Sequence, residues 1–330
     1  MTTPLLLLHA ANQSALAPTG RQALLIDNLW WQFFAITGTV YLLVMLVLLG
    51  VAKRSRRDDV AATDPTLSDP PRDRKLTRVV TTLVAITAVI LFGLMLSDFF
   101  TGRRYHALSA TTDLHLKLTG RQWWWEVQYL DAGNPSNQVT TANEIVLPIG
   151  ATVRIDLDAR DVIHSLYIPS LAGKKDLIPG HPTSVWIRPD QVGTFEGQCY
   201  EFCGLAHAKM RLLVRVVSQE EYDAWHKNEL ADAVEPTTDL QKRGRDVFLS
   251  STCVMCHTVL GTPAQGMVGP NLTHIGGRST LAAASLPNDE AHLSAWIVNP
   301  QATKPGVRMP QHQFNDDDLH AMTAYLEALK

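Results

Sequence analysis

The sequence predicts a membrane-anchored multidomain protein: two transmembrane helices, then a β domain, then a small all-helical domain. Three observations predict this fold class. Two long uncharged apolar runs lie in the first third of the chain, residues alternate with a period of two in its middle, and helical periodicity returns from Leu240. The length of 330 residues allows about two domains.

Composition excludes several other classes of protein. The net charge of −3 and the pI of about 6.4 argue against nucleic acid as a partner, because proteins that bind it are usually basic. A hydrophobic share of 46% is too high for a disordered chain. The 4 cysteines are too few for a disulfide scaffold, and they fall into two close pairs, which is typical of metal or cofactor sites.

Residues 1–104 are predicted to form an N-terminal segment and a two-helix transmembrane hairpin. The predicted spans are 28–52 and 79–97, and a helix that crosses a bilayer needs about 20 apolar residues. A buried core helix would show the same pattern. The loop 53–78 is rich in lysine and arginine, so the positive-inside rule places it in the cytoplasm. The short apolar stretch Leu5–Leu8 lacks the basic residue that precedes a secretory signal.

This orientation places everything after the second span on the periplasmic or outer side of a bacterial plasma membrane. Residues 105–218 are predicted to be a β domain, because apolar residues such as Leu114, Leu116 and Leu118 alternate with polar ones. Proline and glycine separate several such stretches, as in a sandwich or barrel.

The C-terminal third is predicted to be helical. Residues 219–238 read as a polar helix and a linker, and residues 239–330 as a separate domain. Asn315 is expected to cap the last helix, in which Leu319 and Met322 begin one apolar stripe.

The first cysteine pair lies among other soft metal ligands, namely Cys199, Cys203, His207 and Met210. Thiolate, imidazole and thioether together suit copper. Two thiolates can bridge two copper ions, and each ion then needs an imidazole, so His164 is the candidate second histidine. A zinc site built from the same cysteines and histidines is an alternative, although zinc rarely recruits a thioether. A disulfide between the cysteines is another.

The second cysteine pair forms the haem c attachment motif Cys253-Val-Met-Cys256-His257. The motif predicts that the cysteines bind the porphyrin covalently and that His257 becomes the proximal iron ligand. Met309 is the predicted distal ligand, and such His/Met ligation raises the haem potential. A redox dithiol or a zinc half-site is the alternative for the motif. The alternative distal ligands are Met255, Met267, Met322, His274, His292, His312 and His320.

The chain resembles subunit II of cytochrome c oxidase in three stretches: Asp161-Val-Ile-His-Ser-Leu166, the run from Pro169 to Gly180, and Gln198-Cys-Tyr-Glu-Phe-Cys-Gly-Leu-Ala-His-Ala-Lys-Met210. The resemblance implies a cupredoxin-like β-sandwich that holds dinuclear copper A. It implies that Cys199 and Cys203 bridge the coppers. The implied terminal ligands are His164, His207 and Met210.

Two further roles follow from the resemblance alone. Glu201 is implied to bind copper through its backbone carbonyl and to reach, through its carboxylate, a magnesium site shared with subunit I. The run Gln122-Trp-Trp-Trp-Glu126 matches an aromatic patch of the family, and Trp123 aligns with the tryptophan that accepts electrons from cytochrome c. Trp124 and Trp125 would serve equally well to pack a core.

The C-terminal domain is similar to class I cytochrome c in Val268-Gly-Pro-Asn-Leu-Thr273, Trp296-Ile-Val-Asn-Pro300 and the Met309-Pro310 turn. The resemblance as a whole covers about residues 25–330. It indicates the caa-type subclass, whose subunit II carries a fused cytochrome c. All the cysteines and one methionine per centre are then used.

These features predict an electron-transfer subunit of a terminal respiratory oxidase. Electrons would pass from cytochrome c or another periplasmic donor to haem c, then to copper A and to the oxygen-reducing subunit I. Subunit III and membrane lipid are further expected partners. The chain has no oxygen-reducing centre of its own, so its enzyme activity is that of the proton-translocating complex. The alternatives are the matching subunit of a nitric oxide reductase with copper A and a membrane-tethered copper-binding or assembly protein.

Some positions depart from the family pattern. Many relatives have a glutamate near the start of the second span that loads a proton channel, but the stretch 75–83 contains no carboxylate. Proton uptake must therefore use another group or another route. Arg121 stands where a histidine often precedes Gln-Trp, and Tyr200 follows the first copper cysteine where a small residue is usual.

Overall fold

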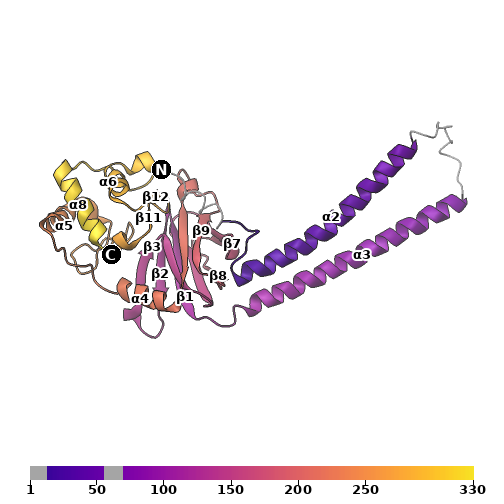
Figure 1. Ribbon diagram of the computed structural model, residues 1–330, viewed down its shortest axis with the longest axis horizontal. Coiled ribbons are helices and arrows are strands. Elements are labelled where there is room, and N and C mark those ends of the chain that lie inside the picture. The colour runs from indigo at the N-terminus through magenta and orange to yellow at the C-terminus, as the bar shows by residue number, and fades with distance from the viewer. Residues whose placement is uncertain (1–12, 56–69) are drawn as a thin grey trace. The chain divides into compact units, whose positions relative to one another are not determined.

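The computed structural model describes residues 13–55 and 70–330 (Figure 1). The stretch Leu5–Leu8 and the middle of the predicted loop 53–78 lie outside the described residues. The described chain forms two compact units. One contains residues 25–107, and the other contains residues 13–24 and 108–330.

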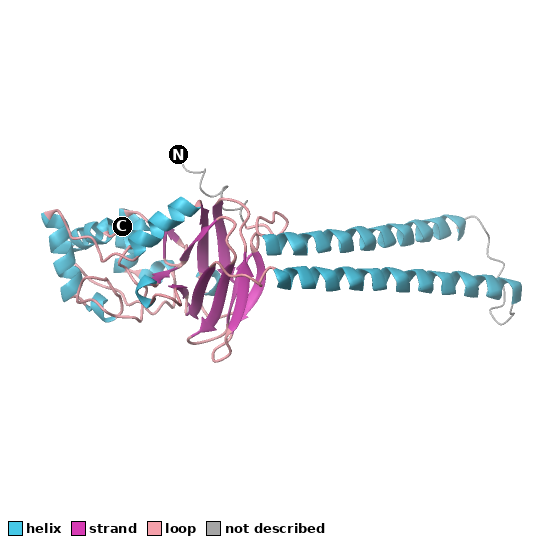
Figure 2. Cartoon of the chain, turned by 90° about the horizontal axis from the view of Figure 1, so that it is seen from below, coloured by secondary structure: helices cyan, strands magenta, loops and turns pink. Residues whose placement is uncertain are grey.

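Two long helices carry the apolar runs: α2 (Arg21–Ser55) and α3 (Pro70–Ala107) (Figures 1 and 2). Both are long and apolar enough to cross a membrane, and their most apolar stretches are only 0% and 6% buried. They are therefore not the core helices of a soluble domain. Both extend beyond the predicted spans, because a helix satisfies its own backbone in lipid and in water alike.

The polar side chains of these helices find partners within the hairpin. The Ser97 hydroxyl donates to Gln32 Oε1 across the pair at 2.6 Å. The hydroxyls of Thr37 and Thr39 each donate to a carbonyl one turn back in α2 at 2.7 Å. Such bonds matter in lipid, where no water is present to satisfy a free polar group.

The middle of the chain folds into two five-stranded sheets, ordered β3-β2-β1-β5-β8 and β4-β10-β9-β6-β7. Their inward-facing residues form one apolar core, which confirms the predicted β-sandwich. The strands are β1 (Leu114–Arg121), β2 (Trp124–Leu130), β3 (Val139–Ala142), β4 (Glu144–Pro148), β5 (Val153–Ala159), β6 (His164–Ile168), β7 (Ala172–Leu177), β8 (Thr183–Ile187), β9 (Gly193–Cys199) and β10 (Arg211–Val217).

A capped helix, α4 (Gln219–Glu229), packs Tyr222 and Trp225 against Tyr129 of β2. Residues 231–238, all of them described, contain no helix or strand. This stretch matches the predicted linker in position, and the Thr238 capping box starts the next helix.

The C-terminal domain is helical, as predicted (Figure 2). Asn315 caps the last helix, because its side chain accepts a hydrogen bond from the Asp318 amide at 2.8 Å. The helices are α5 (Asp239–Ser250), α6 (Glu290–Val298), α7 (Pro300–Thr303) and α8 (Asp316–Ala328), with a small sheet of β11 (Thr280–Leu281) and β12 (Leu286–Pro287).

Helices α5 and α8 cross closely because Gly244 has no side chain. A Cβ atom at this position would overlap the Ala321 carbonyl of α8. We expect Gly244→Ala to lower the free energy of unfolding of this domain by about 2 kcal/mol, a usual cost of overpacking. Thermal unfolding followed by helical circular dichroism measures the change.

Gly277→Ala is the matched control, because a Cβ there would lie 3.8 Å from its nearest neighbour, the Lys330 Cα. Equal melting temperatures for the two variants would show that the crossing has room to spare.

Candidate metal centre and haem cavity

The residues predicted to hold copper come together where β6, β9 and β10 meet. Strand β9 ends at Cys199, and the loop that follows returns to β10 so closely that the Cys199 amide donates to the Met210 carbonyl at 2.9 Å. Strand β6 pairs with β9 through Leu166 and Cys199, which brings His164 to the same end of the sheet. Sheet pairing thus assembles residues that are far apart in sequence.

The sulfur and nitrogen atoms of this cluster lie within a few ångströms of one another. The Sγ atoms of Cys199 and Cys203 are 3.8 Å apart. His164 Nδ1 lies 3.9 Å from Cys199 Sγ, and His207 Nδ1 lies 3.5 Å from Cys203 Sγ. Met210 Sδ is 3.9 Å from Cys203 Sγ. We call these residues the thiol cluster.

The thiol cluster is largely shielded from water, with only His207 half-buried. Cys199, Cys203, His164 and Met210 are all buried, and both cysteines are free thiols. The hydrogen bond between the thiols lowers the pKa of Cys199 and raises that of Cys203, which burial raises further. A metal that bound here would release the remaining proton. Met210 within the cluster favours copper over zinc.

His164 is held by a carboxylate behind it. Its Nε2 lies 2.9 Å from Asp161 Oδ1, so Nδ1 is the nitrogen that faces the thiol. Burial alone would lower the pKa of His164, but hydrogen bonds to Cys199 and Asp161 raise it overall. A carboxylate that orients a histidine in this way is typical of metal sites.

The carbonyl of Cys203 is bound from the other side by two neighbouring residues. It accepts the Trp123 indole N–H at 2.9 Å and the Gln122 side-chain amide at 2.7 Å. Gln122 also donates its backbone N–H to Asp161 at 2.7 Å. Asp161 and Gln122 therefore support both sides of the cluster. Sequence reasoning had assigned no role to either, although both lie beside predicted site residues.

Glu201 lies between the cysteines, as its sequence position requires. Its backbone oxygen is 3.3 Å from Cys199 Sγ, whereas its carboxylate lies 3.4 Å from Lys174 Nζ. The carbonyl and the carboxylate of this residue thus have separate neighbours.

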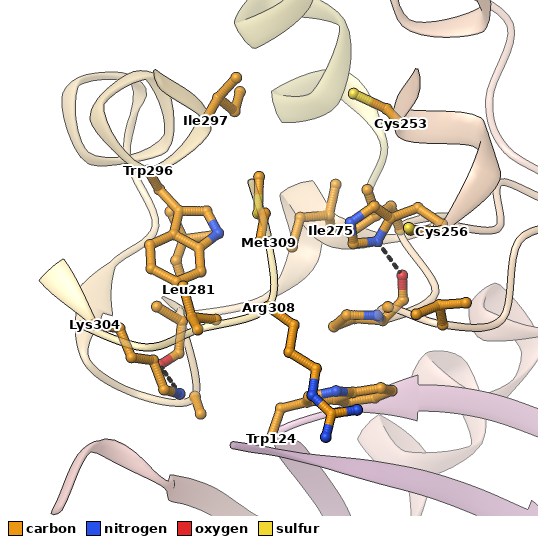
Figure 3. A pocket seen from close by; sticks show the side chains of 18 of the residues that line it. Trp124, Cys253, Cys256, Ile275, Leu281, Trp296, Ile297, Lys304, Arg308 and Met309 are labelled. Carbon is orange, nitrogen blue, oxygen red and sulfur yellow. Dashed lines mark hydrogen bonds between the residues drawn. The ribbon is translucent and has the colours of Figure 1, made fainter. Parts of the chain in front are cut away.

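A cavity of about 650 Å³ contains the residues of the predicted haem site, including Cys253, Cys256, His257 and Met309. Its volume is in the range of pockets that hold cofactors. Figure 3 shows Met309 projecting into the cavity between Trp296 and Ile275, with Cys253 and Cys256 on its rim. The remaining wall is mainly apolar, so the residues present fit a porphyrin.

His257 is oriented for use of its outer nitrogen. Its Nδ1 lies 2.7 Å from the Pro270 carbonyl, which leaves Nε2 as the free ligand atom. Gly269 packs on the ring, because a Cβ there would come within 2.6 Å of His257 Cε1. Burial lowers the pKa of His257, so the neutral form that binds iron is favoured.

Three of the other candidate distal ligands, Met255, His312 and Met322, also line the cavity, and the ring of His312 stacks on Phe314. Met255 and Met267 are 71% and 78% exposed. Both ring nitrogens of His274 face carbonyl oxygens, and His292 and His320 each contact a carboxylate. Met322 belongs to the packed apolar core. Met309 combines a place in the cavity with a loop position before α8.

The three tryptophans have three different positions. Trp125 is fully buried in the β-sandwich, as a core residue would be. Trp124 lines the haem cavity and lies under the Arg121 guanidinium, 5.3 Å from its ring centroid. Trp123 also lines the cavity, and its indole N–H binds Cys203. Trp123 therefore touches both candidate sites.

Two buried charged residues join the β domain to the C-terminal domain. Glu144 accepts hydrogen bonds from the backbone and the hydroxyl groups of both Ser279 and Thr280, at 2.9–3.2 Å. Lys304 donates to the carbonyls of Trp123 and Ala282. The burial of Glu144 and Lys304 has no signal in the sequence, because glutamate and lysine are usually exposed and no local pattern marks a buried one.

Glu144 should hold the two domains together. In Glu144→Ala, the donors of Ser279 and Thr280 lose a charged acceptor, so we expect unfolding free energy to fall by about 2–3 kcal/mol. Chemical denaturation followed by tryptophan fluorescence measures it. Glu235→Ala is the control, because that exposed carboxylate pairs only with Arg245 at the surface. If Glu144→Ala lost no more unfolding free energy than Glu235→Ala, Glu144 would not hold the two domains together.

Comparison with known proteins identifies both domains. A model of the cytochrome c oxidase subunit II periplasmic domain matches residues 114–217, and a model of cytochrome c matches residues 241–330. Cytochrome c oxidase subunit 2 of Alkalihalophilus pseudofirmus is 32% identical over 323 residues, which cover 97% of this chain and 91% of the relative.

A second relative and a solved structure are also similar to this chain. Cytochrome c oxidase subunit 2 of Bacillus subtilis is 29% identical over 263 residues, covering 75% of this chain and 71% of the relative. A crystal structure of the periplasmic domain of subunit II of cytochrome oxidase of Bradyrhizobium japonicum is 31% identical and covers 36% of this chain and 94% of that one, with a TM-score of 0.34. The identity and coverage of the Alkalihalophilus pseudofirmus relative show that the chain belongs to the cytochrome c oxidase subunit II family, with a cytochrome c domain after its β domain.

Proposed function

We propose that this subunit accepts electrons from an external donor at its C-terminal domain and delivers them, through Trp123, to the thiol cluster and on to subunit I. When bound, haem c and copper A supply one-electron transfer. The observation that carries the proposal is the position of Trp123, which lines the haem cavity and hydrogen-bonds the Cys203 carbonyl at 2.9 Å.

The residues that would hold each group follow from the geometry. For the copper pair they would be Cys199, Cys203, His164, His207, Met210 and the Glu201 carbonyl. For haem c, Cys253 and Cys256 would form the thioether bonds, and His257 and Met309 would bind the iron. Cys199, Cys203, His164 and Met210 are buried and the haem-binding residues are half-buried, which limits the water around both groups.

The chain's surroundings are part of the proposal. Basic residues such as Lys53, Arg54 and Lys75, at the ends of α2 and α3, favour a cytoplasmic loop, and the β and C-terminal domains would then lie on the outer side. The Glu201 carboxylate supports a magnesium site shared with subunit I. Subunit III and proton translocation belong to the assembled complex, and the missing carboxylate in 75–83 assigns proton uptake to another group or route.

Metal analysis and spectroscopy test the proposal on the full-length chain. We expect about two coppers per covalent haem, and an electron paramagnetic resonance signal from one electron shared by both nuclei. After rapid reduction of the haem, we expect the absorption of oxidised copper to decrease as the haem is reoxidised. Bound zinc, or a copper localised on one nucleus, would contradict the dinuclear site. In the assembled complex, oxygen consumption distinguishes an oxidase from a nitric oxide reductase.

Met309→Ala tests the axial ligand. The haem should remain attached through its cysteines, while its potential falls by on the order of 0.1 V because the thioether that favours the ferrous state is gone. Potentiometric titration of the haem absorption measures the change. Met267→Ala serves as the control, because Met267 is 78% exposed. An unchanged potential in Met309→Ala would remove Met309 from the iron.

A further inference from the structure

Lys304 is an unusual residue for its position. It is 2% exposed, and no described carboxylate lies within ion-pair distance of its amine. Its Nζ donates instead to two carbonyl oxygens, those of Trp123 at 2.5 Å and Ala282 at 3.2 Å. Burying an amine without a carboxylate costs free energy. The contacts of the loop that follows Lys304 must therefore offset the cost of burying its amine.

The loop that begins at Lys304 leads directly to Met309. Hydrogen bonds from Gln301 of α7 hold this loop. The Gln301 side chain accepts the Gly306 amide at 2.8 Å and donates to the Val307 carbonyl at 2.6 Å. The position of Lys304 is therefore transmitted to Met309 by a short, hydrogen-bonded segment and not by a free chain.

The same loop touches the β domain at two further points. Arg308 donates to the Gln122 side chain at 3.1 Å. Gly306 has a φ of +87°, and a Cβ there would lie 3.0 Å from Leu205 and 3.5 Å from Trp123. Only glycine fits this approach comfortably. Lys304, Gly306 and Arg308 thus bind one small area, around Trp123 and Gln122.

That area is the one that holds the thiol cluster. The backbone carbonyl of Trp123 accepts a hydrogen bond from the Lys304 amine. The indole N–H of Trp123 donates a hydrogen bond to the Cys203 carbonyl. The contacts form a continuous path: the Met309 loop, Lys304, the Trp123 main chain and ring, and the Cys203 carbonyl. Figure 3 shows Lys304, Arg308 and Met309 along this loop, with Trp124 of β2 below it.

We propose that Lys304 is a positioning residue, which seats the Met309 loop on Trp123 and so sets the contact through which electrons pass from the haem domain to the copper domain. This inference rests on the proposed function. Lys304 binds neither iron nor copper. Its role is geometric, and two N–H donors at the end of an unbranched side chain are sufficient for it.

Three variants distinguish the hydrogen bonds donated by Lys304 from its charge and from the volume of its side chain. Lys304→Met keeps an unbranched chain of similar length but has no donor. Lys304→Gln keeps an N–H₂ group that can donate to two carbonyls, without the charge. Lys242→Met is the control, because Lys242 is half exposed and pairs only with Asp239 one turn away.

The first measurement is the rate of haem-to-copper electron transfer in the full-length chain with both groups loaded. We expect Lys304→Met to be slower by about 10-fold or more, since small misplacements are costly to a rate, with the haem still attached and the copper content unchanged. Lys304→Gln should recover most of the rate. A Lys304→Met rate within twofold of wild type, or a Lys304→Gln rate as slow as that of Lys304→Met, would overturn the proposal.

The second measurement does not depend on activity. Hydrogen exchange of the copper-free chain should be at least about 10-fold faster in Lys304→Met than in Lys242→Met in peptides covering 120–125 and 300–310, because the docked contact is lost. Unchanged exchange there would also overturn the proposal. A wild-type chain that transfers no electrons between its centres would instead contradict the proposed function itself.

Discussion

The carbonyl oxygen of Cys203 is the point on which the arrangement of both sites depends. It receives hydrogen bonds from the Trp123 indole and the Gln122 amide, while its own side chain lies in the thiol cluster. The turn between β1 and β2 is therefore hydrogen-bonded to the loop that follows β9. Because Trp123 also lines the cavity, a displacement of the loop after β9 would change both the thiol cluster and the cavity wall.

Rigid surroundings explain how a loop of eleven or so residues can hold such a compact cluster. Both ends of the loop are sheet residues, paired as Gln198 with Arg211. Asp161 holds His164 at one side and the Gln122 backbone at the other. Side chains held in this way would need little rearrangement if a bound metal changed its oxidation state.

The surface between the β domain and the C-terminal domain contains buried charge, which is an expensive way to join two domains. Burial lowers the pKa of Lys304 to about 7, which shows how unfavourable its charged form is there. Glu144 satisfies four donors at once, and Arg278 bonds Thr141 and the Asn271 carbonyl. Apolar residues would stabilise a contact with less geometric precision. Directional hydrogen bonds select one docked arrangement, so the cavity faces Trp123 and Trp124.

The sequence alone determined those features whose chemistry is local. Two apolar runs, a Cys-x-x-Cys-His motif and a cluster of soft ligands within a dozen residues identify membrane helices and cofactor sites, because spacing along a helix or loop places such groups without reference to the rest of the chain. The Asn315 cap is local in the same sense. Only the tertiary structure decided which of three adjacent tryptophans is core and which faces the cavity, and that Glu144 and Lys304 are buried. Residue type does not encode burial for these side chains, since it depends on which surfaces meet after the strands and helices have formed.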